Sequence, residues 1–248
     1  MSNGSERIHD ALIVGSGAAG GAAAAHLAAT GHDVLVLERD AEPRIKPCGG
    51  GMAASVQQWF PFSLDPAVEQ VIRRVDFSWC LDDPVVAELP GEAPFWIVRR
   101  ERLDRLLLEK ALEAGATLHC PCLVQQVERE DGQWTIRGDS GKSLTTRAVV
   151  IADGSASPWS GQFGLGPRDL HLASTLSVRL EGLGTLNPGV ARFEFGLVHH
   201  GFAWAFPLNG GINRRWRLLA VRSSPRSMVP RAFRRAPRTA NNSTWEAD

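Results

Sequence analysis

The sequence predicts a mixed α/β (α+β) fold in which a parallel βαβ unit is interleaved with an antiparallel sheet. Three observations lead to this prediction. An apolar strand, a glycine-rich turn, an alanine-rich helix and a second apolar strand follow one another within residues 10–38. Strand-type segments separated by Gly and Pro occupy residues 71–98 and recur beyond residue 172. Between them, residues 102–114 carry apolar side chains at helical spacing.

The composition is that of an ordinary globular protein. The 248 residues are 44% hydrophobic and 22% charged, which excludes a disordered chain and suffices for a core. No apolar run reaches the roughly 18 residues of a membrane span, and the polar start, residues 1–10, lacks the apolar stretch of a signal peptide. Four cysteines in a chain of this length do not indicate a disulfide framework. We therefore expect a cytoplasmic protein.

The βαβ unit begins with the apolar strand at residues 10–14. Residues 21–30 are rich in alanine, which has strong helix propensity, and Gly31 stands where a helix usually ends. Residues 33–37 form a second apolar strand, with Glu38 directly after it. Strands that are apolar along their whole length are typical of a parallel sheet covered on both faces.

Residues 41–66 are rich in Gly and Pro and predict an active-site loop. The helix expected at 102–114 places Leu103, Leu107 and Ala111 on one face. Further strands are predicted at 71–79, 85–89, 95–98, 116–119, 123–129, 133–137, 144–151, 172–180, 190–198 and 202–206.

The motif Gly15-x-Gly17-x-x-Gly20 lies between the first strand and the helix, where it indicates a dinucleotide site. Gly15 permits the tight turn, Gly17 lets a pyrophosphate approach the backbone, and Gly20 lets helix and strand pack closely. The helix N-terminus offers unpaired N–H groups to the phosphates. Glu38 is placed to accept hydrogen bonds from a ribose diol. These residues alone leave FAD and NAD open.

No metal site or nucleophile triad is expected. Cys120-Pro121-Cys122 has no second cysteine pair at zinc spacing, so strand thiols are the favoured interpretation. The seven histidines form no triad or ligand cluster in the sequence.

Four segments resemble known signatures. Residues 100–104 (RERLD) and 152–155 (ADGS) resemble paired motifs of the p-hydroxybenzoate-hydroxylase-like flavoproteins. Residues 43–51 (PRIKPCGGG) resemble the PxxKxCGGG segment of the geranylgeranyl reductase family. Residues 201–207 (GFAWAFP) resemble that family's GYxWxFP segment, with phenylalanine where tyrosine is usual. The chain is thus similar to that family over residues 8–213.

The resemblance implies a Rossmann-type FAD-binding domain interleaved with an antiparallel-sheet substrate domain. Arg100 would neutralise pyrophosphate charge, and Cys48 with the following glycines would line the flavin ring. Trp204 and Phe206 would wall the substrate tunnel. An isolated alkene also needs a proton on its other carbon, and the expected donor is Cys48 or an ordered water. The residues implied to bind FAD are Gly15, Gly17, Ala18, Ala19, Gly20, Glu38, Arg39, Lys46, Cys48, Gly49, Gly50, Gly51, Arg100, Asp153 and Gly154.

Simpler interpretations stay open for several of these residues. Arg100 would equally suit the exposed start of a helix, and Asp153-Gly154 an ordinary turn. Trp204 and Phe206, two apart on a strand, would equally suit a sheet core. Cys48 would equally be an inert buried thiol.

The expected domains are an FAD-binding domain at 8–60 with 100–160 and a substrate sheet at 61–99 with 166–213. Residues 214–248 are expected to lie outside the fold. They hold nine Arg against two acids (+7), whereas residues 1–213 hold 18 Lys and Arg against 25 Asp and Glu (−7). This tail is open to three interpretations: a basic arm, a tail without a folded role, or a change of reading frame near residue 213.

The resemblance implies reduction of prenyl carbon–carbon double bonds in an isoprenoid lipid or chlorophyll precursor, with NADPH as the electron donor. The family's later Gly-Asp-Ala segment is absent, so we expect a chain shortened at its C-terminus. The alternatives are a flavin monooxygenase or halogenase of the same fold and a non-catalytic fragment. The expected partner is a prenyl-lipid substrate rather than nucleic acid, with peripheral membrane contact left open.

Overall fold

The computed structural model describes residues 7–222 except 43, 45, 47, 166–173, 182–186, 199–200 and 209–214. It confirms the mixed α/β class, with several sheets and helices. The chain divides into two units. The first unit combines Met1–Arg44 with Glu101–Asp169, and the second combines Ile45–Arg100 with Leu170–Asp248.

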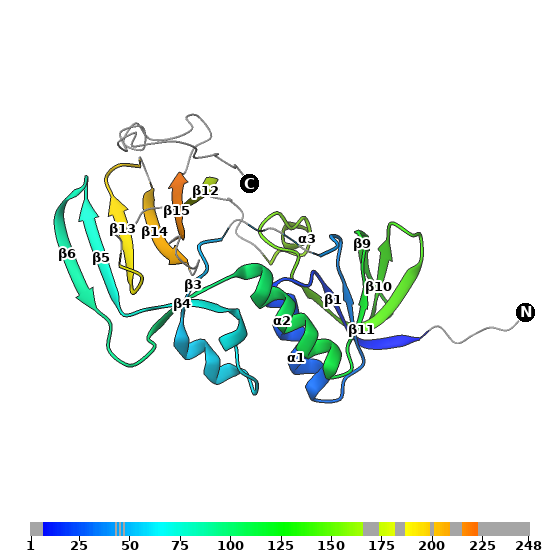
Figure 1. The fold of residues 1–248 in the computed structure, drawn as a ribbon. Helices are drawn as coiled ribbons and strands as arrows, with labels where there is room; N and C mark the ends of the chain where they lie inside the picture. Colours follow the sequence, from blue (N-terminus) through cyan, green and yellow to red (C-terminus); the bar gives the residue numbers. More distant parts are fainter. Residues whose placement is uncertain are drawn as a thin grey trace, which may run out of the picture. The chain divides into compact units, whose positions relative to one another are not determined.

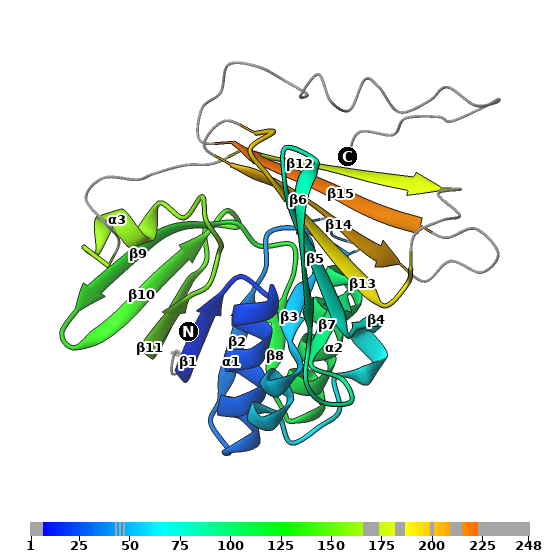
Figure 2. The ribbon, with the colours of Figure 1, turned by 90° about the vertical axis from the view of Figure 1, so that its left-hand side faces the viewer.

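The first unit is built on a six-stranded sheet. Its strand order is β8-β2-β1-β11-β10-β9, parallel from β8 to β11 and antiparallel for the last two strands. Figures 1 and 2 show its helices α1 (Ala18–Ala29) and α2 (Arg100–Glu113) lying side by side. The strands are β1 (Ile8–Val14), β2 (Val34–Leu37), β8 (Thr117–His119), β9 (Val124–Glu130), β10 (Gln133–Gly138) and β11 (Ser143–Ile151).

The core of this unit follows from the strand composition. Strand β2 is buried at all four residues, as expected of a strand covered on both faces. Leu12 and Leu35 share one core cluster with Trp159 of the short helix α3 (Trp159–Gln162). Where α1 meets α2, Gly21 has no side chain, and a Cβ there would lie 3.0 Å from the Leu107 Cβ.

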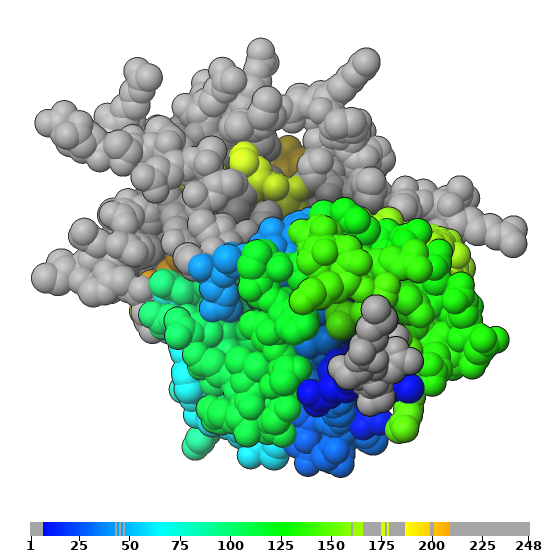
Figure 3. Space-filling view, turned by 90° about the vertical axis from the view of Figure 1, so that its right-hand side faces the viewer, coloured from blue at the N-terminus to red at the C-terminus, as the bar shows by residue number. Residues whose placement is uncertain are grey.

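Both chain segments of the first unit share one surface. Figure 3 shows the N-terminal part in blue directly against the later part in green, although residues 45–100 separate them in the sequence. The parallel pairing of β1 with β11 explains this arrangement, because it aligns Ile8–Val14 with residues 145–151.

The second unit contains two sheets. A six-stranded sheet has the order β12-β15-β14-β13-β5-β6 and is antiparallel except between β13 and β5 (Figure 2). A three-stranded antiparallel sheet has the order β3-β7-β4. The strands are β3 (Gly51–Ala53), β4 (Val68–Ile72), β5 (Arg74–Trp79), β6 (Asp82–Glu88), β7 (Phe95–Val98), β12 (Ser174–Glu181), β13 (Val190–Phe195), β14 (Phe202–Leu208) and β15 (Arg215–Arg222).

Two details of the first half of this unit differ from the sequence analysis. The strand expected at 71–79 is broken at Arg73, because β4 and β5 pair in different sheets. Residues 45–60, grouped above with the nucleotide-binding half, belong to the second unit. The reason is that β3, inside the expected loop 41–66, pairs with β7. Two short 3₁₀ turns, Ala54–Trp59 and Asp65–Ala67, follow β3.

The expectation that residues 214–248 lie outside the fold is wrong for their first part. Strand β15 pairs with β12 on one side and β14 on the other. Pairing between two neighbouring strands engages the backbone, and the run from Trp216 to Val221 is rich in strand-forming apolar residues despite the arginines around it. Residues 223–248, the rest of that tail, lie outside the described residues.

No helix in the described ranges combines the length and the hydropathy needed to cross a membrane.

Candidate functional site

The glycine turn between β1 and α1 is geometrically restricted. Gly15 has φ +95°, and a Cβ on it would lie 2.5 Å from the Ala152 carbonyl oxygen. A Cβ on Gly20 would lie only 1.8 Å from the Gly15 carbonyl oxygen. The extended Gly17 precedes α1, and among the described residues no side chain caps this helix. The turn therefore leaves the N-terminus of α1 open to an anion.

Glu38 lies beside this turn and is buried, with 7% of its surface exposed. Its Oε2 accepts hydrogen bonds from the Ser16 backbone N–H at 2.7 Å and from the Ser16 hydroxyl at 2.9 Å. Oε1 accepts the Asp40 N–H at 3.0 Å. The parallel pairing of β1 and β2 brings Ser16 and Glu38 to one edge of the sheet.

The surroundings of Glu38 favour its ionised form. Burial alone would raise the pKa of the Glu38 carboxyl, but the N–H groups of Asp40 and Ser16, the Ser16 hydroxyl and the Arg44 charge together lower it. The folded chain therefore holds an ionised carboxylate at the position where a ribose diol would donate.

This lowered pKa predicts loss of stability in acid. A carboxyl with a lower pKa in the folded state binds fewer protons than in the unfolded state, so its contribution is complete above the ordinary value of 4.5 and is lost as the pH falls below it. The difference in unfolding free energy between wild type and Glu38→Gln should therefore shrink between pH 6 and pH 3.5, measured by urea unfolding. The exposed Glu113→Gln serves as control, and a wild-type minus Glu38→Gln difference constant with pH would contradict this assignment.

Arg44 is a site residue that sequence reasoning missed. Its Nη1 donates to Glu38 Oε2, and its Nη2 donates to the Ser16 carbonyl oxygen at 3.1 Å. Only 6% of its side chain is exposed. Arg44 lies in the 43–51 segment, where the family resemblance directed attention to Lys46 and Cys48 instead.

Asp153 and Gly154 reach the same turn from the end of β11. The Ala152 N–H donates to the Val14 carbonyl oxygen at 2.8 Å, and the Asp153 Cα would lie 3.0 Å from a Cβ on Gly15. Within the described part of the chain, Asp153 Oδ1 is buried without a hydrogen-bond partner. A buried carboxylate oxygen without a donor is costly, so it fits a site completed by a ligand.

Other predicted FAD-binding residues occupy varied positions. Arg39 is exposed and donates to Asp40 through both Nε and Nη2. Arg100 is the first residue of α2 and half-buried, and Lys46 is also half-buried. Ala18 and Ala19 begin α1. Their roles in cofactor binding stay predictions.

The Cys48–Gly51 segment lies in the second unit. Gly50 has φ +76°, and a Cβ on it would lie 2.1 Å from the Val98 carbonyl oxygen. Its N–H donates to Cys48 Sγ at 3.4 Å, while Val98 N–H donates to the Gly50 carbonyl oxygen at 2.8 Å. The half-buried Cys48 thiol is thereby held beside β7.

Aromatic side chains of the same unit pack against these glycines. A Cβ on Gly49 would lie 2.6 Å from the Trp204 Nε1, and one on Gly51 would lie 3.1 Å from Phe206. The Trp204 Nε1 is buried and has no hydrogen-bond partner within the described ranges. The glycine run is therefore also required by the chain's own aromatic rings, which sequence reasoning did not anticipate.

Trp204 and Phe206 belong to a larger aromatic face of the second unit. Phe206 is 3% exposed and belongs to a core cluster, whereas Trp204 is half-buried against it. Successive ring centroids are 5.1–6.4 Å apart, the range of favourable aromatic pairing. The rings are Phe77, Phe95, Phe193, Phe195, Phe202, Trp204 and Phe206.

Cys120 and Cys122 support the segment that follows β2. The Cys122 N–H donates to the Glu38 carbonyl oxygen at 2.7 Å, and Cys120 Sγ donates to the Asp40 carbonyl oxygen at 3.4 Å. Burial raises the pKa of both thiols, which favours their protonated form. No group of three or more potential metal ligands occurs among the described residues.

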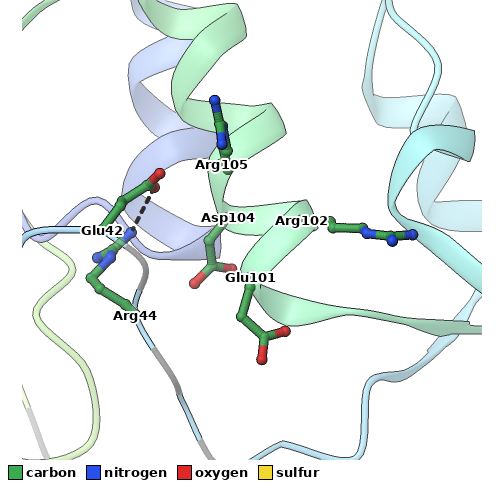
Figure 4. Close-up of a pocket in the computed structure, with 6 residues that line it drawn as sticks. All are labelled: Glu42, Arg44, Glu101, Arg102, Asp104 and Arg105. Atoms are coloured by element: carbon green, nitrogen blue, oxygen red, sulfur yellow. Dashed lines mark ion pairs between the residues drawn. The ribbon is translucent and has the colours of Figure 1, made fainter.

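A pocket of about 390 Å³ opens in the first unit next to the 42–44 segment. Arg44 forms one side, where it pairs with Glu42 at 4.0 Å (Figure 4). The first turns of α2 form another side, so acidic and basic groups balance around the space. The lining residues are Glu42, Arg44, Glu101, Arg102, Asp104 and Arg105.

These features define a Rossmann-type dinucleotide-binding protein. They are a glycine turn at a helix N-terminus, a buried acid after the second parallel strand, and a sheet built from two separate chain segments. A protein-family model described as "Lycopene cyclase protein" matches residues 10–176. The chain belongs to this family, and with its relatives it falls among the geranylgeranyl-reductase-like FAD-dependent oxidoreductases.

One curated relative and two solved structures illustrate this placement. The chain is 29% identical to digeranylgeranylglycerophospholipid reductase 2 of Methanothermobacter thermautotrophicus, over 82% of this chain and 55% of the relative. A geranylgeranyl bacteriochlorophyll reductase-like protein from Thermoplasma acidophilum matches with TM-score 0.69 and 22% identity, over 88% of this chain and 57% of that one. A mutant of halogenase PltM in complex with FAD matches with TM-score 0.70 and 18% identity, over 92% of this chain and 55% of that one.

At 22% and 18% identity, the two solved structures show that the fold is shared. The chain spans about half the length of the curated relatives it matches.

Proposed function

We propose that this chain is the FAD-binding and substrate-facing part of a reductase of prenyl carbon–carbon double bonds. The observation that carries the proposal is the Cys48–Gly51 segment, whose glycines pack against Trp204 and Phe206 within one unit. A thiol and an aromatic face held together suit an apolar alkene substrate. The similarity to a digeranylgeranylglycerophospholipid reductase supports the same substrate class.

The residues of the first unit fit the adenosine diphosphate half of FAD. The open N-terminus of α1 offers a site for an anion. The ionised Glu38 carboxylate offers an acceptor for a ribose diol. Asp153 Oδ1 offers a further acceptor that has no hydrogen-bond donor in the described part of the chain. Gly15 and Gly20 permit the tight turn beside which these groups lie.

The residues of the second unit would shape the reaction. When bound, FAD supplies the hydride chemistry, with NADPH as the proposed electron donor. Trp204 and Phe206 would hold the apolar chain and exclude water from it. Cys48 Sγ would donate the proton that the second alkene carbon requires. These steps, the membrane-lipid substrate and peripheral contact with a membrane belong to the proposal.

An assay of prenyl reduction tests this proposal. FAD-loaded protein reduced under anaerobic conditions by NADPH or dithionite should add two hydrogens per double bond to a geranylgeranyl lipid, measured by mass spectrometry. Cys48→Ala should lower the rate on the order of 100-fold while FAD stays bound, because a positioned proton donor is removed. The exposed Cys80→Ala should react as wild type.

A second candidate is a flavin-dependent monooxygenase or halogenase, favoured by the fold shared with halogenase PltM at TM-score 0.70. The same preparation distinguishes the two. A product that requires oxygen, with no saturated prenyl product under anaerobic conditions, would contradict the reductase proposal and support the alternative.

A further inference from the structure

Arg44 has a buried side chain whose position the glycine motif does not explain. In the structure it pairs with Glu38, the carboxylate expected to bind a ribose diol. We propose that Arg44 recognises the diphosphate of an adenine dinucleotide and leaves Glu38 in order to do so. This inference rests on the cofactor of the proposed function but concerns a residue outside the predicted FAD-binding set.

Glu38 can accept only a limited number of hydrogen bonds. A carboxylate has about four acceptor positions, two on each oxygen. Oε2 already receives three donors, from the Ser16 N–H, the Ser16 hydroxyl and Arg44. Oε1 receives the Asp40 N–H. These four donors fill the four positions, so one of them must leave before a ribose hydroxyl can bind within this number.

Arg44 is the donor best placed to leave. The N–H groups of Ser16 and Asp40 belong to short backbone segments fixed on either side of Glu38, and the Ser16 hydroxyl is on a short side chain of the same turn. Arg44 reaches Glu38 through a long side chain, which can change rotamer while its backbone stays in place. Its departure would lower the number of donors on Glu38 from four to three, which leaves one acceptor position of the carboxylate for a ribose hydroxyl.

The Arg44 guanidinium also has a new partner within its reach in the proposed complex. Arg44 Nη2 already donates to the Ser16 carbonyl oxygen, inside the turn that precedes α1. A diphosphate at the N-terminus of α1 would therefore lie beside the guanidinium. The planar guanidinium matches phosphate oxygens through two parallel hydrogen bonds.

The exchange must also leave both charges, on Arg44 and on Glu38, with a partner. Breaking a buried ion pair is unfavourable unless each partner gains a replacement. Here a ribose hydroxyl replaces Arg44 on Glu38, and the diphosphate replaces Glu38 on Arg44. Glu42, 4.0 Å from Arg44 at the edge of the pocket in Figure 4, remains as a second carboxylate for the guanidinium.

Calorimetric titration with ADP and with adenosine tests the exchange, because adenosine carries the diol without the diphosphate. In Arg44→Ala the affinity for ADP should fall about 10- to 100-fold, as expected for lost charge-assisted hydrogen bonds. The affinity for adenosine should stay equal or rise, because Glu38 is released. Arg44→Lys should recover part of the ADP affinity and none of the bidentate geometry.

The control is Arg147→Ala, which removes an exposed arginine paired with Asp10 at the opposite end of β1. Circular dichroism and thermal melting show whether each variant is folded, and Arg44→Lys replaces Arg44→Ala if the latter is not. Parallel loss of ADP and adenosine binding would overturn the proposal, because it would show a purely structural role. Unchanged ADP affinity would also overturn it. If wild type binds neither ligand, the nucleotide site of the proposed function fails instead.

Discussion

Replacing Gly20 with alanine is expected to lower the free energy of unfolding by about 3 kcal/mol or more and to abolish nucleotide binding. The reason is steric. The new Cβ would lie 1.8 Å from the Gly15 carbonyl oxygen, which is backbone and cannot rotate away as a side chain could. Either α1 moves away from β1 or the glycine turn is displaced. Both changes remove the open helix N-terminus on which an anion site depends.

Gly161→Ala is a matched control for this substitution. Gly161 is also helical, in α3, and a Cβ there would meet no atom within 4 Å. Alanine has the higher helix propensity, so this variant should be as stable as wild type or slightly more stable. Urea unfolding of the two variants compares them directly. Equal stability of Gly20→Ala and Gly161→Ala would contradict the close packing between α1 and the turn.

The second large effect concerns Glu38. Glu38→Ala should weaken FAD binding by about 1.5–3 kcal/mol, because it removes the charge-assisted hydrogen bonds expected with the ribose. Wild type should bind FAD more tightly than NAD, because NAD has no isoalloxazine ring. Glu113→Ala, an exposed carboxylate of α2 paired with Lys110, should leave the affinity unchanged.

The nucleotide-binding half was predictable because its chemistry limits the residue types. Only glycine accommodates the contacts at Gly15 and Gly20, and these positions are adjacent in sequence to strands with an unmistakable apolar pattern. The mixed α/β class followed from the same local signals, whereas the family followed from the resemblance of four short segments to known motifs, and both are confirmed. Glu38 could be proposed for a similar reason, since it directly follows the second strand, and its role in binding a ribose stays a prediction.

The missed features depend on contacts between distant residues. Arg44 became visible as a site residue only when its guanidinium was seen on Ser16 and Glu38. The packing of Trp204 on Gly49 joins residues far apart in the sequence. Strand β15 was misjudged because the arginines around it dominated the composition, whereas strand pairing depends on the backbone.

The central claim is that this chain binds FAD through the glycine turn and Glu38. Its most direct test is an equilibrium titration of the purified chain with FAD and NAD, followed by flavin fluorescence and by calorimetry, in wild type and Glu38→Ala. We predict tighter binding of FAD than of NAD, and a loss in Glu38→Ala within the range given above. Tighter binding of NAD, or an FAD affinity that does not change in Glu38→Ala, would contradict the claim.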